Sequence, residues 1–187
     1  MVTFVWVLTG ITALLLLVVV TGFNRLRRAD LAAREAIGGI DVQLTRRAEL
    51  VPRLVETVKA HAAHEQGVLG EVTRARTQVQ RATEGDDVGS RAEADAGLER
   101  SLADLTAVAK NYPTLRADAT FSELLRQLAD VEGQVAFARQ YYNDTVRRLN
   151  DLVATVPWMF LTGVARVHSR DFYEAPEGHR EVPGAPF

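Results

Sequence analysis

The 187-residue chain contains no cysteine, which excludes disulfide bonds, cysteine-ligated metal sites and thiol catalysis. Aromatic residues make up only 7% of it, a composition that suits a helical protein better than a β-sandwich. The 22 basic and 24 acidic residues leave a net charge of −2, so no bulk positive field is available to hold nucleic acid. We therefore expect a helical protein that does not bind nucleic acid.

Motifs for known chemistry are also missing. The sequence has no G-x-S-x-G, no Walker loop and no dinucleotide fingerprint, so hydrolysis by a serine nucleophile, nucleotide use and NAD chemistry have no visible basis. His61 and His64, followed by Glu65, have the spacing of a partial metal site on one helical face. A second ligand cluster would be needed to complete it. We expect no metal site, catalytic residue or cofactor; a metal-dependent hydrolase that uses these three residues is the weakest alternative.

One long stretch, residues 2–23, has no charged side chain. A helix of that length reaches about 33 Å, enough to cross a hydrocarbon core of about 30 Å. The alternative is a cleaved signal peptide, which needs positive charge before the apolar run and a small-residue cleavage pattern after it. Neither is present, so the sequence predicts a transmembrane anchor over residues 1–23.

Positive charge follows this stretch, at Arg25, Arg27 and Arg28. By the positive-inside rule, these residues predict that the N-terminus lies outside and that the chain from residue 24 onward is cytoplasmic. We expect a single-pass protein of the bacterial inner membrane, because lysine is nearly absent, as is common in bacteria with GC-rich genomes. Arginines beside a span are ordinary topology residues and do not by themselves indicate a specific lipid.

Apolar residues recur at three- and four-residue steps from residue 30 to about 83, which predicts helix in one or two pieces. Pro52 has no amide hydrogen, so we expect it to kink this helix or to begin a new one. Residues 83–97 are polar and carry too little apolar surface to bury, which predicts a loop. The next apolar stripe predicts a helix over residues 98–112 that must end before Pro113.

The longest apolar stripe covers residues 121–156 and predicts a single helix of about 50 Å. Thr120 and Glu123 have the spacing of an N-terminal capping box. Such a long stripe needs long partners, so we predict an all-α fold: the transmembrane helix, then an elongated antiparallel four-helix bundle over residues 24–156. Residues 157–187 contain four prolines, which predicts an irregular tail packed on the bundle.

The densest mixture of aromatic and polar residues falls in the middle of the last predicted helix. We favour a structural role, in which Tyr142 packs in the core and Arg139 pairs with a carboxylate on the facing helix, such as Asp41. A partner-binding patch is the alternative. The candidate cluster comprises Asp41, Arg139, Tyr141, Tyr142 and Asn143.

The sequence Trp158-Met159-Phe160-Leu161 opens the predicted tail. Amphipathic aromatic residues favour the bilayer surface, so this segment could dip into the membrane. We expect it to pack on the end of the bundle instead, because large apolar side chains are more often buried.

Several segments resemble the LemA family of bacterial proteins, and together they cover nearly the whole chain. They are IDVQLTRRAELVPRLVETV (40–58), His64-Glu65, AVAKNYP (107–113), FARQYYND (137–144) and the closing segment 172–187. The resemblance implies an N-terminal membrane anchor with a short outside end, a cytoplasmic antiparallel four-helix bundle and no established enzymatic activity. The chain departs from the family's usual residues at Ile37-Gly38-Gly39 and at Gly133, so straight, continuous helices are not expected there.

The leading hypothesis is a non-enzymatic, single-pass membrane-anchored scaffold or assembly protein, in which the bundle serves self-association or partner recruitment. Its partners would be the lipid bilayer through the anchor, a second copy of the chain, and an unknown cytoplasmic or membrane protein. The alternative is an accessory or regulatory subunit of a membrane-bound protease, because some members of the family are encoded beside genes for such enzymes.

Overall fold

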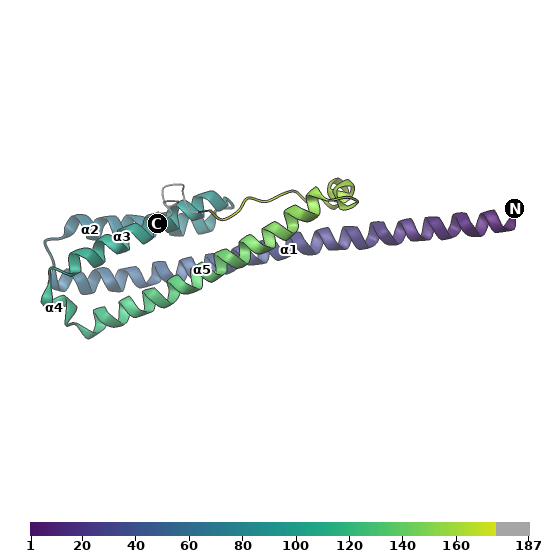
Figure 1. Cartoon of the computed structure of the whole chain (residues 1–187). Coiled ribbons are helices and arrows are strands. Elements are labelled where there is room, and N and C mark those ends of the chain that lie inside the picture. Colours follow the sequence, from purple (N-terminus) through teal and green to yellow (C-terminus); the bar gives the residue numbers. More distant parts are fainter. Residues whose placement is uncertain (175–187) are drawn as a thin grey trace, which may run out of the picture. The chain divides into compact units, whose positions relative to one another are not determined.

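The computed structural model of this chain describes residues 1–174, and every regular element within them is helical (Figure 1). The elements are α1 (Val2–His61), α2 (Gln66–Glu84), α3 (Val88–Ala109), α4 (Pro113–Arg116), α5 (Ala119–Ala154), the 3-10 helix η1 (Trp158–Leu161) and α6 (Thr162–Ala165). The predicted all-helical fold that begins with a long apolar helix is confirmed. The prediction for the last part of the tail lies outside the described residues.

The chain forms two compact units, and both α1 and α5 contribute to each of them. Unit 1 comprises residues 1–37 and 141–171. Unit 2 comprises residues 38–140 and the segment that begins at Phe172.

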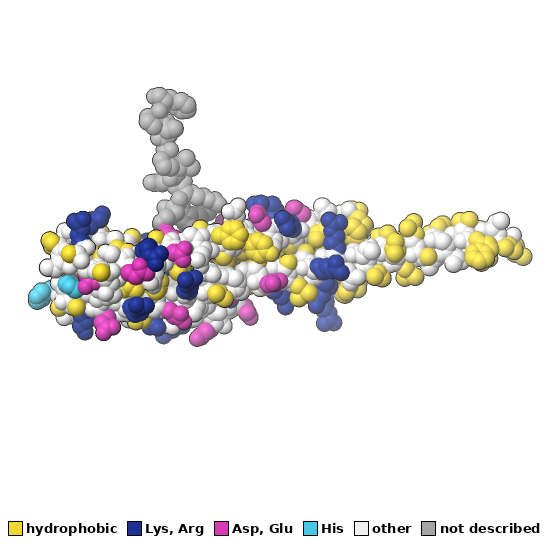
Figure 2. Space-filling model, turned by 90° about the horizontal axis from the view of Figure 1, so that it is seen from below, with side chains coloured by type: hydrophobic (Ala, Val, Ile, Leu, Met, Phe, Trp, Pro, Cys, Tyr) yellow, Lys and Arg dark blue, Asp and Glu magenta, His cyan; other side chains and the backbone are white. Residues whose placement is uncertain are grey.

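The apolar start of α1 has the properties of a membrane span. Within residues 1–174 it belongs to the one helix long and apolar enough to cross a membrane, and its most apolar 18-residue window has no buried residue. Figure 2 shows hydrophobic side chains along it and basic side chains where this stretch ends. Thr9, Thr12 and Thr21 donate their hydroxyl hydrogens to carbonyl oxygens one turn earlier, at 2.8 to 2.9 Å. These bonds lower the cost of placing the hydroxyls in lipid.

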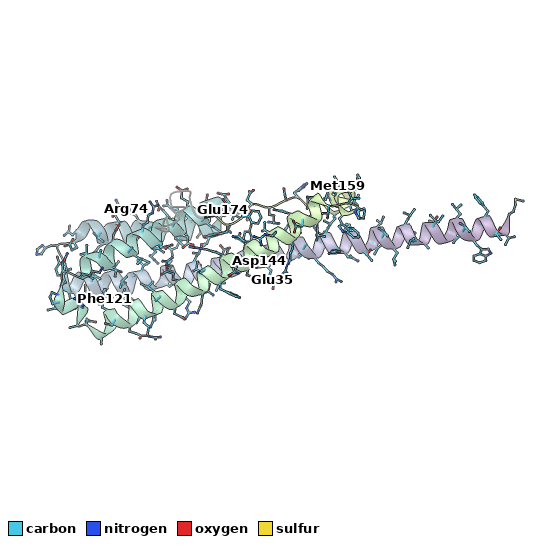
Figure 3. The ribbon with its side chains drawn as sticks, in the orientation of Figure 1. Glu35, Arg74, Phe121, Asp144, Met159 and Glu174 are labelled. Atoms are coloured by element: carbon cyan, nitrogen blue, oxygen red, sulfur yellow. The ribbon has the colours of Figure 1, made fainter. Side chains whose placement is uncertain are left out.

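The rest of unit 1 packs against the end of this apolar stretch. After α5, the short helices η1 and α6 turn the chain, and Arg166 adopts a left-handed conformation (φ 51°) as it leaves α6. The turn carries Met159 and lies beside α1 (Figure 3). A Cβ atom at Gly22 would lie 2.5 Å from the Trp158 ring, so only glycine permits this approach. The buried residues of unit 1 include Leu26, Ala33, Tyr142, Val146, Leu149, Ala165 and Val167.

Unit 2 has a helical core in which α2 packs against α3. Most of its buried apolar residues lie on α1, α2, α3 and α5, at the three- and four-residue steps that the sequence showed. They include Leu44, Leu54 and Val58 of α1, Val72 and Val79 of α2, Leu98 and Leu105 of α3, and Leu124 and Val131 of α5. That these helices form an antiparallel four-helix bundle stays a prediction.

The prediction that Pro52 breaks or kinks the helix is wrong about the break, because α1 runs through it to His61. A proline removes the amide donor for the carbonyl four residues earlier, which here is Ala48. The Arg76 Nε of α2 donates to that Ala48 oxygen at 3.1 Å, and Ala48 itself is 1% exposed. A side chain from a second helix thus replaces the bond that Pro52 cannot make.

This substitution of donors predicts a coupling between Arg76 and Pro52. We expect Arg76→Ala to lower the free energy of unfolding by about 1–2 kcal/mol, because a buried carbonyl loses its donor. Pro52→Ala restores a backbone amide for the same oxygen, so in that background Arg76→Ala is expected to cost less than about 0.5 kcal/mol. Urea unfolding of the four proteins, followed by circular dichroism, measures the coupling. Arg74→Ala, at a largely exposed position of α2, serves as the control.

Other helix boundaries also differ from the predictions. The long helical region breaks at residues 62–65, where no glycine or proline marks it, and Glu65 N–H closes a turn on the Ala62 oxygen. The predicted loop over residues 83–97 is wrong over most of its length, since α2 continues to Glu84 and α3 begins at Val88. α3 also ends at Ala109, before the predicted Tyr112.

The predicted capping box at the start of α5 is wrong as well. Asp118, not Thr120, caps the helix: its carboxylate accepts from Phe121 N–H at 2.9 Å, and this bond holds the pKa of Asp118 below its usual range. Glu123 turns instead to Arg126 and Gln127, which lower its pKa to about 2. The bends expected at Gly38, Gly39 and Gly133 do not interrupt α1 or α5.

Candidate functional site

The carboxylate of Asp95 on α3 is fully buried and is the centre of a cluster of charged and polar side chains in unit 2. Arg47 of α1, 3% exposed, donates to its Oδ1 from Nη1 at 3.2 Å. Arg139 of α5 donates to Oδ2 from Nε at 3.1 Å and also from Nη2. The Tyr173 hydroxyl donates to Oδ2 at 3.0 Å, and the Arg139 guanidinium lies over the Tyr173 ring, 5.5 Å from the ring centroid. One carboxylate therefore joins three helices and the described end of the chain.

This arrangement favours structure over catalysis. Burial raises the pKa of the Tyr173 hydroxyl, and the charge and hydrogen bond of Asp95 raise it further, so the hydroxyl stays a donor. Burial alone would lower the pKa of Arg139, but its pairing with Asp95 outweighs that effect and the pKa is raised. Two arginines and a phenol donate to the oxygens of Asp95, and the fully buried carboxylate is enclosed by these charged and polar partners. Its role is to hold the elements together.

The predicted pairing of Arg139 with Asp41 is wrong, because Arg139 pairs with Asp95. Asp41 instead receives Arg91 of α3 in two bonds, from Nε at 2.6 Å and from Nη2 at 3.2 Å. Arg91 and Asp95 are one helical turn apart, so both face α1. The expected kind of contact is present, but the partners are exchanged.

The three neighbouring cluster residues lie in unit 1 and have different environments. Tyr142 is 1% exposed, as the core interpretation expected, and its hydroxyl donates to the Asp171 carbonyl at 2.9 Å. Asn143 is half-buried. Tyr141 is 52% exposed and lines a pocket. The candidate cluster of the sequence is therefore divided between core and surface.

A second buried carboxylate, Asp30, binds the segment that follows α6 in unit 1, residues 167–171, which we call the return segment. Arg170 donates to its Oδ1 from Nη2 at 2.8 Å and from Nε at 3.1 Å, and the Asp30 side chain is only 4% exposed. Asn150 of α5 bonds both to the Arg170 N–H and to the Arg170 carbonyl, each at 2.9 Å. Together these contacts bind the segment after α6 to both helices of the unit.

His61, His64 and Glu65 do not converge on a common point. The His61 ring is shared between the Thr57 carbonyl, 3.1 Å from Nδ1, and Asp118, 3.9 Å from Nε2. Glu65 accepts the Tyr112 hydroxyl at 2.8 Å, which raises the pKa of that tyrosine, and His64 is exposed. Among the described residues no group of three such side chains is arranged to hold a metal ion.

Sequence reasoning missed most of the residues that form the contacts around Asp95, Asp41 and Asp30. The residues are Asp30, Arg47, Arg91, Asp95, Arg170 and Tyr173. A signal for two of them was present, because Arg91, Asp95, Leu98 and Leu102 continue one helical stripe at three- and four-residue steps. Because Arg91 and Asp95 are charged, a search for apolar residues alone does not extend the stripe to them.

Comparison with known proteins identifies relatives over most of the chain. A family model described as the LemA family matches residues 36–187. The chain is similar to "Magnetosome protein MamQ" of Magnetospirillum gryphiswaldense, 26% identical over 168 residues that cover 76% of this chain and 61% of the relative. It is 27% identical, with the same coverage, to "Magnetosome protein MamQ 2" and "Magnetosome protein MamQ 1" of Paramagnetospirillum magneticum. The chain thus spans about three-fifths of the length of these relatives.

Proposed function

The chain belongs to the LemA family, and on this premise we propose that it is a non-enzymatic, single-pass membrane-anchored scaffold whose helical body self-associates or recruits a partner. The apolar start of α1 and the family relatives indicate membrane association. In the proposal, Arg25, Arg27 and Arg28 keep the body in the cytoplasm of a bacterial cell, with the N-terminus outside the inner membrane. The relatives are magnetosome proteins by name, and we do not extend that association to the process that this chain serves.

The observation that carries the proposal is the continuity of α1. Its exposed apolar stretch passes without a break into residues such as Leu26 and Ala33, which are buried against the rest of unit 1. Because the helix is continuous, no flexible linker separates the apolar stretch from the folded part of unit 1, which therefore begins directly at the membrane surface. Many copies held this way share a thin layer, where high effective concentration makes weak contacts productive.

The antiparallel bundle is the finer part of the proposal and has support in unit 2. Arg46 of α1 bonds to Gln134 of α5 at 3.0 Å, and His61 lies 3.9 Å from Asp118. Residue numbers rise along α1 as they fall along α5, so the two helices run in opposite directions there. The packing of α2 on α3 supplies the second pair.

An exposed apolar pair marks the surface that we propose for contact. Val42 of α1 and Phe137 of α5 expose 62% and 72% of their surface. Val42 precedes Arg46 by about one turn of α1, and Phe137 follows Gln134 by about one turn of α5. In antiparallel helices these two shifts go the same way, so Val42 and Phe137 reach the same level. Aromatic residues at the centre of such a patch are typical of protein contacts.

Photo-crosslinking in the cell tests the proposal. The full chain carries benzoylphenylalanine at position 137, close in shape to the native Phe137, and a matched protein carries it at the exposed Ser122 of the same helix. We expect a crosslinked product from position 137 that position 122 does not give. A product of twice the chain mass indicates self-association, and any other is identified by mass spectrometry. A membrane protease in that product would favour the accessory-subunit alternative. Equal or absent products at both positions would contradict the proposed surface.

A further inference from the structure

A pocket of about 550 Å³ lies in unit 1, between the α1 residues that follow the apolar stretch and the C-terminal part of α5. Its charged side chains are Arg25, Arg28, Arg148 and Asp151, which give the lining a net charge of +2. Two aromatic residues, Tyr141 and Trp158, also line it. Arginines from two helices that are distant in sequence therefore converge on one hollow.

These arginines differ from the buried ones in forming no ion pair with a carboxylate among the described residues. Neither Arg28 nor Arg148 makes an ion pair or hydrogen bond with the described part of the chain, whereas Arg47 and Arg170 both do. Arg25 lies over the Trp158 ring, 5.8 Å from its centroid, which orients the guanidinium without neutralising it. The pocket thus offers positive charge and unused donors to a ligand.

The position of the pocket along α1 matches the headgroup layer of a bilayer. Arg25 and Arg28 follow the last apolar residue, Phe23, by about 3 and 8 Å of helix. The polar layer on each side of a hydrocarbon core is about 5–8 Å thick. Trp158 lies against Gly22, at the end of the apolar stretch, and tryptophan favours this boundary.

Apolar side chains on the adjoining turn point to the same surroundings. Phe160 and Val164 expose 73% and 72% of their surface, and Met159 exposes 42%. Expectation from the sequence was that Trp158–Leu161 would pack on the protein; the Trp158 ring does approach Gly22, but its neighbours remain exposed. An exposed apolar turn beside a basic pocket matches the two parts of a phospholipid.

We propose that this pocket binds the phosphodiester headgroup of an anionic phospholipid, with Arg28 and Arg148 on the phosphate and Arg25, held by Trp158, at its edge. Arginine is suited to this ligand because its planar fork donates two parallel bonds to phosphate. The proposal rests on the proposed function only in requiring that α1 is embedded in a bilayer. Arg27, beside the same span but outside the pocket, provides a matched control.

Lipid quenching of tryptophan fluorescence tests the site, because the chain has only two tryptophans, Trp6 and Trp158. The full Trp6→Phe chain is reconstituted in phosphatidylcholine bilayers. One set of bilayers contains brominated phosphatidylglycerol, and a second set contains brominated phosphatidylcholine at the same mole fraction. We expect stronger quenching of Trp158 by the brominated phosphatidylglycerol. Arg28→Gln and Arg148→Gln should each reduce that preference about tenfold or more, because each removes charge-assisted bonds to the phosphate. Arg27→Gln should reduce it by at most about fivefold, the non-specific effect of one arginine beside an anionic surface.

Each other outcome has a distinct meaning. An equal effect of all three arginine substitutions, or no preference at all, would overturn the pocket and leave the anchor intact. Trp6, observed alone in Trp158→Phe, reports the anchor: if neither brominated lipid quenches it, both the anchor and the lipid site fail. Inorganic phosphate that alters Trp158 fluorescence in pure phosphatidylcholine, and loses the effect in Arg148→Gln, would assign the pocket to a free anion and overturn the lipid proposal.

Discussion

Replacement of Asp95 by alanine is expected to lower the free energy of unfolding by about 3–5 kcal/mol. The carboxylate is fully buried, and its removal leaves Arg47, 3% exposed, without its closest charged partner. Glu132 lies 4.0 Å from Arg47 and is more than half exposed, so it compensates little of that charge. Arg139 and Tyr173 lose their acceptor at the same time. Chemical unfolding of the full chain in detergent, monitored by circular dichroism, measures the loss.

Two further variants separate charge from packing. Asp95→Asn keeps the shape of the side chain but removes the negative charge between two arginines, so we expect a loss close to that of alanine. Asp104→Ala removes an exposed carboxylate from the same helix and should change stability by less than about 0.5 kcal/mol. A loss below about 1 kcal/mol for Asp95→Ala would mean that water, not the carboxylate, solvates these arginines.

The parts of the fold that the sequence predicted are those governed by local periodicity. The apolar residues of α5, such as Leu124, Val131 and Leu149, form a stripe that fixes both the helix and its buried face. Residues 2–23 lack charge, which is enough to identify an apolar helix. In both cases the signal comes from neighbouring residues, so no knowledge of distant contacts is needed.

The failures at residues 83–97 and at Pro52 depend on contacts between distant residues. Residues 83–97 are polar by composition, but Arg91 and Asp95 are buried because Asp41, Arg47 and Arg139 neutralise them. Pro52 stays inside a helix because Arg76 supplies the missing donor. Neither compensation can be found from a local window, since each requires a partner whose position is set by the fold.

The candidate sites follow the same division. Arg25 and Arg28 were identified from their place beside the span, yet as topology residues alone. What makes them part of a pocket is Arg148, which local sequence places on an ordinary helix surface. A site assembled from two helices needs the pairing of those helices, and the sequence predicted that α1 and α5 were long partners without fixing their register.

Replacement of Arg170 by alanine is expected to release the return segment of unit 1. Asp30, 4% exposed at its side chain, would retain only Arg34, whose side chain is 60% exposed and 3.2 Å away. A buried carboxylate that loses its main donor costs about 2–3 kcal/mol, so residues 167–171 should open about 30- to 150-fold more often.

Hydrogen exchange of the segment's backbone amides, read by mass spectrometry, measures this opening because exchange tracks the population of the open state. His168→Ala, at an exposed position of the same segment, should leave exchange unchanged. The double variant Asp30→Asn with Arg170→Ala should exchange more slowly than Arg170→Ala alone, since the stranded charge is then absent. If the double variant opens as fast as the single one, the Asn150 bonds to the Arg170 backbone, not the Asp30 ion pair, hold the segment in place.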